Sequence, residues 1–131
     1  MSKKILILIS VVLAALTFTS CAPLEDEEDG VFVIKNQSEY DDVITDIWIK
    51  KDSESNYFKH EYSDLSIRQN DSFTINDLKS GKKYKFQVEV DVDNNGNNEH
   101  HTFEIGYNVF RKLEDGDTIN VIFDGVGLYF E

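Results

Sequence analysis

The sequence predicts an all-β fold: a single antiparallel sandwich of two sheets with about seven strands. Apolar and polar residues alternate with a period of two in the apolar segments after residue 30, and this alternation is typical of strands with one buried face. No segment in that region keeps the period of an amphipathic helix. Clusters of Asn, Asp, Gly and Ser separate the alternating segments at short intervals, as turns do in sandwiches.

The clearest predicted strand is YKFQVEVDV, residues 84–92. Its even positions from Tyr84 to Val92 are apolar or aromatic, and its odd positions from Lys85 to Asp91 are polar. One face is therefore expected in the core and the other in water. The remaining strands are predicted at residues 31–35, 43–50, 65–68, 72–75, 100–105 and 118–123.

The first twenty residues have the layout of a secretory signal. Lys3 and Lys4 precede an apolar run from Ile5 to about Leu16, and small polar residues follow. The run is shorter than the roughly 20 apolar residues that span a bilayer, which favours a cleaved signal over a membrane anchor. We therefore expect residues 1–20 to be removed.

The single cysteine stands at the end of this signal. Phe18, Thr19, Ser20 and Cys21 resemble the lipobox of bacterial lipoproteins, although that family prefers Leu where Phe18 stands. The resemblance implies a diacylglyceryl group on the sulfur of Cys21, and two or three acyl chains anchor a small domain stably. The alternative is an ordinary secreted protein with a free thiol.

Five consecutive acids, residues 25–29, separate Cys21 from the folded part and end at Gly30. Such a block repels itself and is typical of a solvated spacer. It is interpreted either as a tether, residues 21–30, or as the acidic surface-export signal that some bacterial lipoproteins carry after the acylated cysteine. Residues 31–131 then form one domain.

The charge limits the partners. The formal net charge is −12, and it becomes more negative once the signal is removed. Nucleic acid and anionic lipid surfaces are excluded, because binding to phosphates needs clustered Lys and Arg. Cations and basic protein patches remain.

Residues 72–92 resemble the segment of fibronectin type III domains that contains the tyrosine corner. Leu78, Gly81, Tyr84, Phe86 and Val88 fall at the matching places. The resemblance implies that the Tyr84 hydroxyl bonds back to the preceding loop. The longer stretch from KNQS through IWI to GKKYKFQVEV also resembles prealbumin-like sandwiches of envelope lipoproteins, and neither family supplies catalytic residues.

A calcium site is the best local motif. Asp91, Asp93 and Asn95 alternate before Gly96, as in the first half of a calcium-binding loop, and Glu99 is a further candidate ligand. Position twelve of such a loop is Thr102 rather than Glu, so a simple hairpin turn is the competing interpretation. Calcium is the one cofactor that the sequence suggests.

Two histidines follow this loop. His100 and His101 are neighbours on a predicted strand, so they point to opposite faces and cannot both bind one ion. His101 shares its parity with Phe103 and Ile105, which predicts a place at the core margin.

Four aromatic residues, Trp48, Tyr57, Phe58 and Tyr62, are candidates for a platform that binds a glycan or peptide. Parity places Val43, Thr45, Ile47 and Ile49 on one face of their strand, with Ile44 and Trp48 on the other. Packing at the core or its rim is the alternative interpretation.

No pattern predicts an enzyme, since the chain lacks a nucleophile elbow and its single thiol is assigned to the lipid. The expected function is that of a non-enzymatic protein, anchored to the membrane through Cys21, that binds or scaffolds another envelope or host protein. Calcium or glycan binding is the alternative. The expected location is the cell envelope, at the outer membrane, facing the periplasm or the medium.

Overall fold

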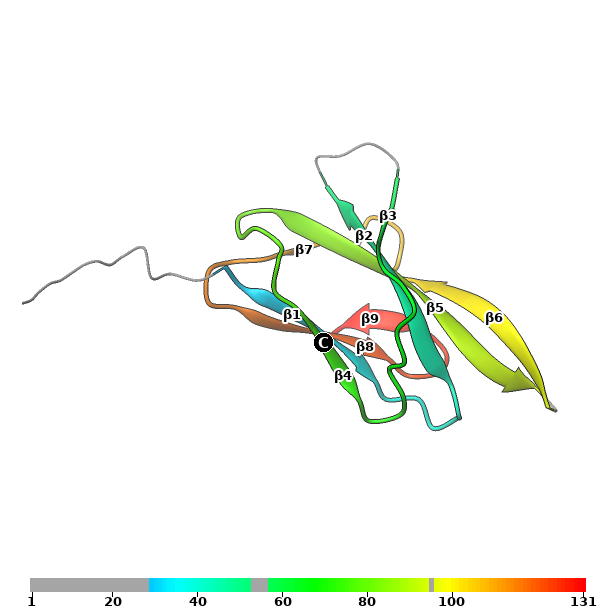
Figure 1. Ribbon diagram of the computed structural model, residues 1–131. Helices are drawn as coiled ribbons and strands as arrows, with labels where there is room; N and C mark the ends of the chain where they lie inside the picture. Colours follow the sequence, from blue (N-terminus) through cyan, green and yellow to red (C-terminus); the bar gives the residue numbers. More distant parts are fainter. Residues whose placement is uncertain (1–28, 53–56, 95) are drawn as a thin grey trace, which may run out of the picture.

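Two β-sheets pack face to face in the computed structural model, which describes residues 29–52, 57–94 and 96–131 (Figure 1). This confirms the predicted all-β sandwich. The strands found in these ranges are β1 (Val31–Asn36), β2 (Val43–Lys51), β3 (Lys59–Tyr62), β4 (Ser72–Ile75), β5 (Lys83–Asn94), β6 (Asn97–Glu104), β7 (Arg111–Lys112), β8 (Thr118–Phe123) and β9 (Leu128–Phe130). None of the described residues belongs to a helix long and apolar enough to cross a bilayer.

The sheets have four and five strands. The first has the order β4-β1-β8-β9, and the second has the order β3-β2-β5-β6 with β7 paired to the start of β5. β1 and β8 run parallel, whereas the other strand pairings described are antiparallel. Residues at the two ends of the domain sequence therefore lie side by side in the first sheet.

The core fills the space between the sheets. Phe32 of β1 lies at its centre, with its ring 4.7 Å from that of Phe86 and 5.8 Å from that of Tyr84 in edge-to-face contacts, the geometry that aromatic pairs favour. The even positions of β5 from Tyr84 to Val90 are buried, as predicted. Fully buried side chains of both sheets surround them: Ile34, Ile44, Ile47, Ile75, Val121 and Phe123.

Several strand predictions need correction. Residues 65–68 do not form a strand but meet β2 in an isolated bridge between Ile44 and Ile67. The prediction overlooked β3, β7 and β9, because β3 is largely polar and exposed and the other two are only two and three residues long. β6 begins at Asn97 rather than at residue 100.

The predicted faces of β2 are wrong at the start of the strand, where Ile44 rather than Val43 faces the core. The register of β2 against β5 shifts between Ile44 and Asp46, which is a β-bulge. The extra residue brings Ile44 into the core together with Ile47 and Ile49. Trp48 points away from the core, as parity predicts.

The hydroxyl of Tyr84 donates a hydrogen bond of 2.8 Å to the carbonyl oxygen of Lys79. This is the contact that the resemblance of residues 72–92 implied. It fixes the loop before β5 against the strand, with Tyr84 itself buried.

Asp29 and Gly30, assigned to the tether from the sequence, contact the domain. The Gly30 amide donates to the Ser80 hydroxyl at 2.9 Å, and the Ser80 amide donates to the Asp29 carboxylate at 3.1 Å. A Cβ atom at Gly30 would clash with the Glu114 carbonyl oxygen, so only glycine fits this approach. The chain therefore enters the domain at a fixed point beside the start of β5.

Candidate functional site

The face of the five-stranded sheet that points away from the core is the outer face. Directly opposed residues of paired strands share a face, so the register places Trp48, Gln87 and Glu104 in one row and Lys50 and Lys85 in the next. Toward the β5–β6 hairpin tip the same face presents acids and a histidine. The outer face thus carries most of the chemistry-bearing side chains singled out below.

Trp48 lies in the middle of the outer face and stacks on His60 of β3. The ring centroids are 4.3 Å apart and the planes differ by 14°. His60 Nε2 lies 2.7 Å from an Asp46 carboxylate oxygen, which orients the imidazole. One face of the indole is therefore covered by the protein's own side chain.

The other predicted platform residues divide between the two faces. Tyr62 packs edge-on against Phe73 on the core side, and its hydroxyl donates to Asp77 at 2.7 Å. Burial and the Asp77 carboxylate raise the pKa of Tyr62. Tyr57 is exposed, and Phe58 lies over two lysines of the outer face. The four aromatics do not form one surface.

At the end of the outer face near the start of β5, rings cover two cations. We call this group the lysine cluster: Lys50, Lys85, Phe58, Tyr107 and Phe110. Lys85 Nζ lies 5.8 to 5.9 Å from the centroids of all three rings, and it pairs with a Glu104 carboxylate oxygen at 2.8 Å. Lys85 is only 3% exposed, although its strand parity predicted a position in water. Two loops supply the rings that cover it.

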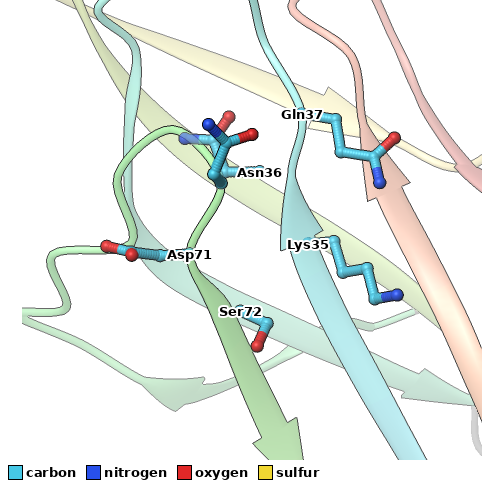
Figure 2. A pocket seen from close by; sticks show the side chains of 6 residues that line it. Lys35, Asn36, Gln37, Asp71 and Ser72 are labelled. Carbon is cyan, nitrogen blue, oxygen red and sulfur yellow. The ribbon is translucent and has the colours of Figure 1, made fainter.

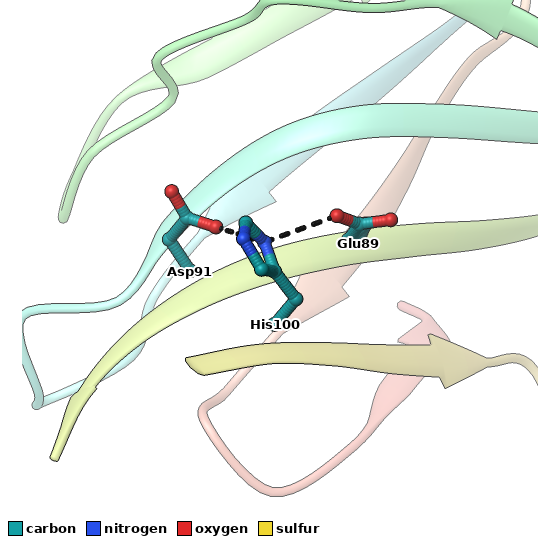
Figure 3. Close-up of side chains that lie close together, drawn as sticks. All are labelled: Glu89, Asp91 and His100. Atoms are coloured by element: carbon teal, nitrogen blue, oxygen red, sulfur yellow. Dashed lines mark ion pairs between the residues drawn. The ribbon is translucent and has the colours of Figure 1, made fainter. Parts of the chain in front are cut away.

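Near the hairpin tip, three ionisable side chains converge on the same face (Figure 3). This acid–histidine cluster comprises Glu89 and Asp91 of β5 and His100 of β6. His100 Nδ1 lies 2.5 Å from Asp91 Oδ1 and 3.1 Å from Glu89 Oε2. Both carboxylates thus approach the same ring nitrogen.

The residues predicted for calcium are separated by the hairpin. Asp91 pairs with His100 and Asp93 with Asn98 on the outer face. Glu99 is opposite Val92, so it projects from the other face, where its carboxylate lies 3.1 Å from His101 Nε2. Asp93 Oδ1 accepts the Gly96 amide at 3.1 Å, and Asn95 is outside the described residues.

His101 is exposed at the margin of the core. It lines a hollow of about 330 Å³ at this end of the sandwich, together with Tyr40, Val92, Phe103 and Gly125. The predicted parity with Phe103 therefore holds.

A second hollow, of about 230 Å³, opens where β1 ends beside the start of β4 (Figure 2). Its central polar residue, Asn36, is fully buried and donates its side-chain amide to the carbonyls of Asp42 and Ile67 at 2.8 and 2.9 Å. The side-chain amide of Asn36 is therefore already hydrogen-bonded within the fold and does not remain available to a ligand. This hollow is interpreted as structural.

Sequence reasoning missed Glu89 and His100 as partners. The signal was present in the register: a tight turn at Gly96 pairs Asn94 with Asn97 and therefore Asp91 with His100. Strand parity rules out a metal site shared by His100 and His101, but it does not show which residues of β5 lie beside His100. Nothing local in the sequence indicated that Phe58, Tyr107 and Phe110 would meet over Lys85.

Comparison of the chain with protein-family models, with curated proteins and with solved structures gave no match. Cys21 and the signal-like segment lie outside the described residues.

Proposed function

We propose that this chain is a lipid-anchored, non-enzymatic protein of the cell envelope that binds another protein through its outer face. The support for the anchor is the signal-like segment that ends at Cys21. Acyl chains on that sulfur hold a small domain at a bilayer. The support for binding comes from the folded domain.

The observation that carries the binding proposal is the exposed aromatic surface at the lysine cluster. Tyr107 is 87% exposed although its ring lies 5.9 Å from the buried ammonium group of Lys85. Val109, two residues further on, is 47% exposed. Tyrosine is enriched in protein interfaces because its apolar ring and hydroxyl both find partners there, and the covered ammonium group of Lys85 lies against this ring.

The partner we infer is a protein surface that combines an apolar patch with Lys or Arg. The chain has a net charge of −12, and the outer face adds acids at the hairpin tip. Charge of this sign steers basic surfaces toward the domain and repels acidic ones.

The alternatives of calcium and glycan binding have less support. Glu99 projects from the face opposite Asp91 and Asp93, and His60 already covers one face of the Trp48 indole. Both stay predictions.

The anchor is tested by fractionating cells that express the natural chain or Cys21→Ala. We expect the natural chain in the membrane fraction with an intact mass that includes acyl chains, and the variant without them. An unmodified thiol on the natural protein would overturn the anchor.

The binding surface is tested by crosslinking on membranes, followed by mass spectrometry of the crosslinked partner. We expect one partner protein to be captured by the natural chain and lost with Tyr107→Ser. Tyr40→Ser is the matched control, since Tyr40 is also exposed, at 62%, but lines the hollow at the other end of the sandwich. Equal capture by both variants would rule out the lysine cluster as the interface.

A further inference from the structure

The acid–histidine cluster has the ligand set of a metal site. Its three ligand atoms, one from each of Glu89, Asp91 and His100, all lie within 4.8 Å of one another. They come from two paired strands rather than from a loop, so their spacing is set by backbone hydrogen bonds. A site built on strands is more rigid than one built on a loop.

The hydrogen-bonding capacity of the His100 ring does not satisfy both carboxylates. Nδ1 can carry one proton, which points at one acceptor, yet two carboxylate oxygens lie at 2.5 and 3.1 Å from it. Asp91 Oδ1 exposes less than 1 Å² to solvent; it is paired with the His100 ring but makes no well-formed hydrogen bond. A buried carboxylate oxygen without a well-formed hydrogen bond is unfavourable, and a cation shared by all three groups would give it a better partner.

We propose that Glu89, Asp91 and His100 bind a divalent first-row transition-metal ion, with Nδ1 and one oxygen of each carboxylate as ligands. Such ions bond to nitrogen and oxygen at about 2.0–2.2 Å, so adjacent ligand atoms lie roughly 3.0–3.6 Å apart. The observed spacing reaches this with small side-chain movements. Water fills the remaining positions, because the His100 side chain is 64% exposed.

The imidazole nitrogen selects the class of ion. Calcium and magnesium take oxygen ligands, whereas imidazole suits zinc, copper, nickel and iron. The site therefore differs in residues and in metal from the calcium loop predicted at residues 91–99. It shares only Asp91 with that loop.

The test is a calorimetric titration with Zn²⁺ at pH 7.5. The protein is the full chain in detergent with Cys21→Ala, which removes a thiol that would bind zinc. We expect saturable binding of one ion, not displaced by millimolar Ca²⁺. His100→Gln and Glu89→Gln should each weaken binding at least about tenfold.

His101→Gln is the matched control. His101 is the next residue, on the other face of β6, and it pairs with the single carboxylate of Glu99 at 3.1 Å. Its loss should leave zinc affinity unchanged. Absence of saturable binding, or equal weakening by His100→Gln and His101→Gln, would overturn the proposal.

A direct measurement keeps the proposal testable if a variant unfolds. Histidine ring ¹⁵N spectra of the Cys21→Ala chain should show Zn²⁺ shifting Nδ1 of His100 while the rings of His60 and His101 stay unchanged. A shift confined to another histidine would contradict the assignment. The titration needs no protein partner, so its outcome is independent of the proposed interface.

Discussion

The two ends of the outer face hold charge in opposite ways. At the lysine cluster, the ammonium group of Lys85 has a carboxylate at 2.8 Å and three rings around it, and it is almost fully covered. At the acid–histidine cluster, two carboxylates compete for one nitrogen of His100, and all three side chains are partly exposed. At the first end the charge is paired and covered. At the second end the charges are incompletely paired and exposed to solvent.

This difference separates structural charge from charge available to a ligand. A buried ion whose partners are all supplied by the fold offers nothing to a ligand, although it can support a surface that does. Two carboxylates and an imidazole that do not satisfy one another, and that solvent can reach, can bind a cation. The substitutions below should therefore affect stability at the first end far more than at the second.

The largest effect is expected from Lys85→Ala. The substitution removes three methylenes and the ammonium group of a buried side chain that packs under the rings, and each buried methylene contributes about 0.8 kcal/mol. Chemical denaturation should show a loss of about 2–4 kcal/mol in the free energy of unfolding. Lys50→Ala, at the directly opposed and more exposed position, should lose about 1 kcal/mol or less.

Equal losses for the two lysines would mean that the rings do not distinguish them. The description of Lys85 as the buried member would then be wrong.

A smaller effect is expected from Glu104→Gln, which leaves the covered ammonium group of Lys85 without its counterion. Breaking a fully buried pair costs about 3–5 kcal/mol, but the Glu104 side chain is 44% exposed, so we expect about 1–2 kcal/mol. Glu89→Gln, in metal-free buffer, should change the unfolding free energy by about 0.5 kcal/mol or less. A reversed order in urea denaturation would contradict the comparison.

Tyr84→Phe tests the core-facing side of the same strand, where the tyrosine hydroxyl donates a hydrogen bond to the Lys79 carbonyl oxygen. Loss of this partly buried hydrogen bond should cost about 1 kcal/mol. Tyr107→Phe is the control, since its hydroxyl belongs to an exposed residue and its loss should stay within about 0.5 kcal/mol. Thermal unfolding of both variants would show whether the hydrogen bond between Tyr84 and Lys79 stabilises the domain.

The smallest effect is expected from Asp124→Asn at the other end, where the next residue, Gly125, lines the same hollow as His101. The Asp124 carboxylate accepts the amides of Val126 and Gly127, both at 2.8 Å, which lowers its pKa from the ordinary 3.8. A lowered pKa stabilises the fold above the ordinary value, and this contribution is lost as the pH falls through the folded-state pKa.

At pH 7 the natural chain should therefore unfold at a higher urea concentration than Asp124→Asn. The difference between the two midpoints should become smaller as the pH falls below about 4. A gap that does not depend on pH would show that the carboxylate charge is not involved.

Much of the fold follows from local patterns. Alternation located β5 and β8, and the resemblance of residues 72–92 to fibronectin type III domains implied the hydrogen bond that the Tyr84 hydroxyl makes. What local patterns could not show is how distant segments pair. The parallel pairing of β1 with β8 joins residues about 90 positions apart, and short or polar strands such as β3 become strands only because a neighbour is present.

The candidate site was harder to predict from the sequence, because it too depends on how separate segments of the chain pair. The convergence of Asp91 and His100 depends on hairpin register, which one glycine turn fixes. The burial of Lys85 depends on loops that precede β3 and follow β6. Parity describes which way a side chain points, but not what another part of the chain places over it.

The fixed entry of the chain at Gly30 has a mechanical consequence. Gly30 lies at the start of β1, while the hairpin tip lies at the far end of the sandwich (Figure 1). Tension applied at the entry point and resisted at the far end would run along β1, which is bonded to β4 on one side and to β8 on the other. Because β1 is hydrogen-bonded on both sides, a pull along it would load these backbone bonds together, in shear, rather than one after another.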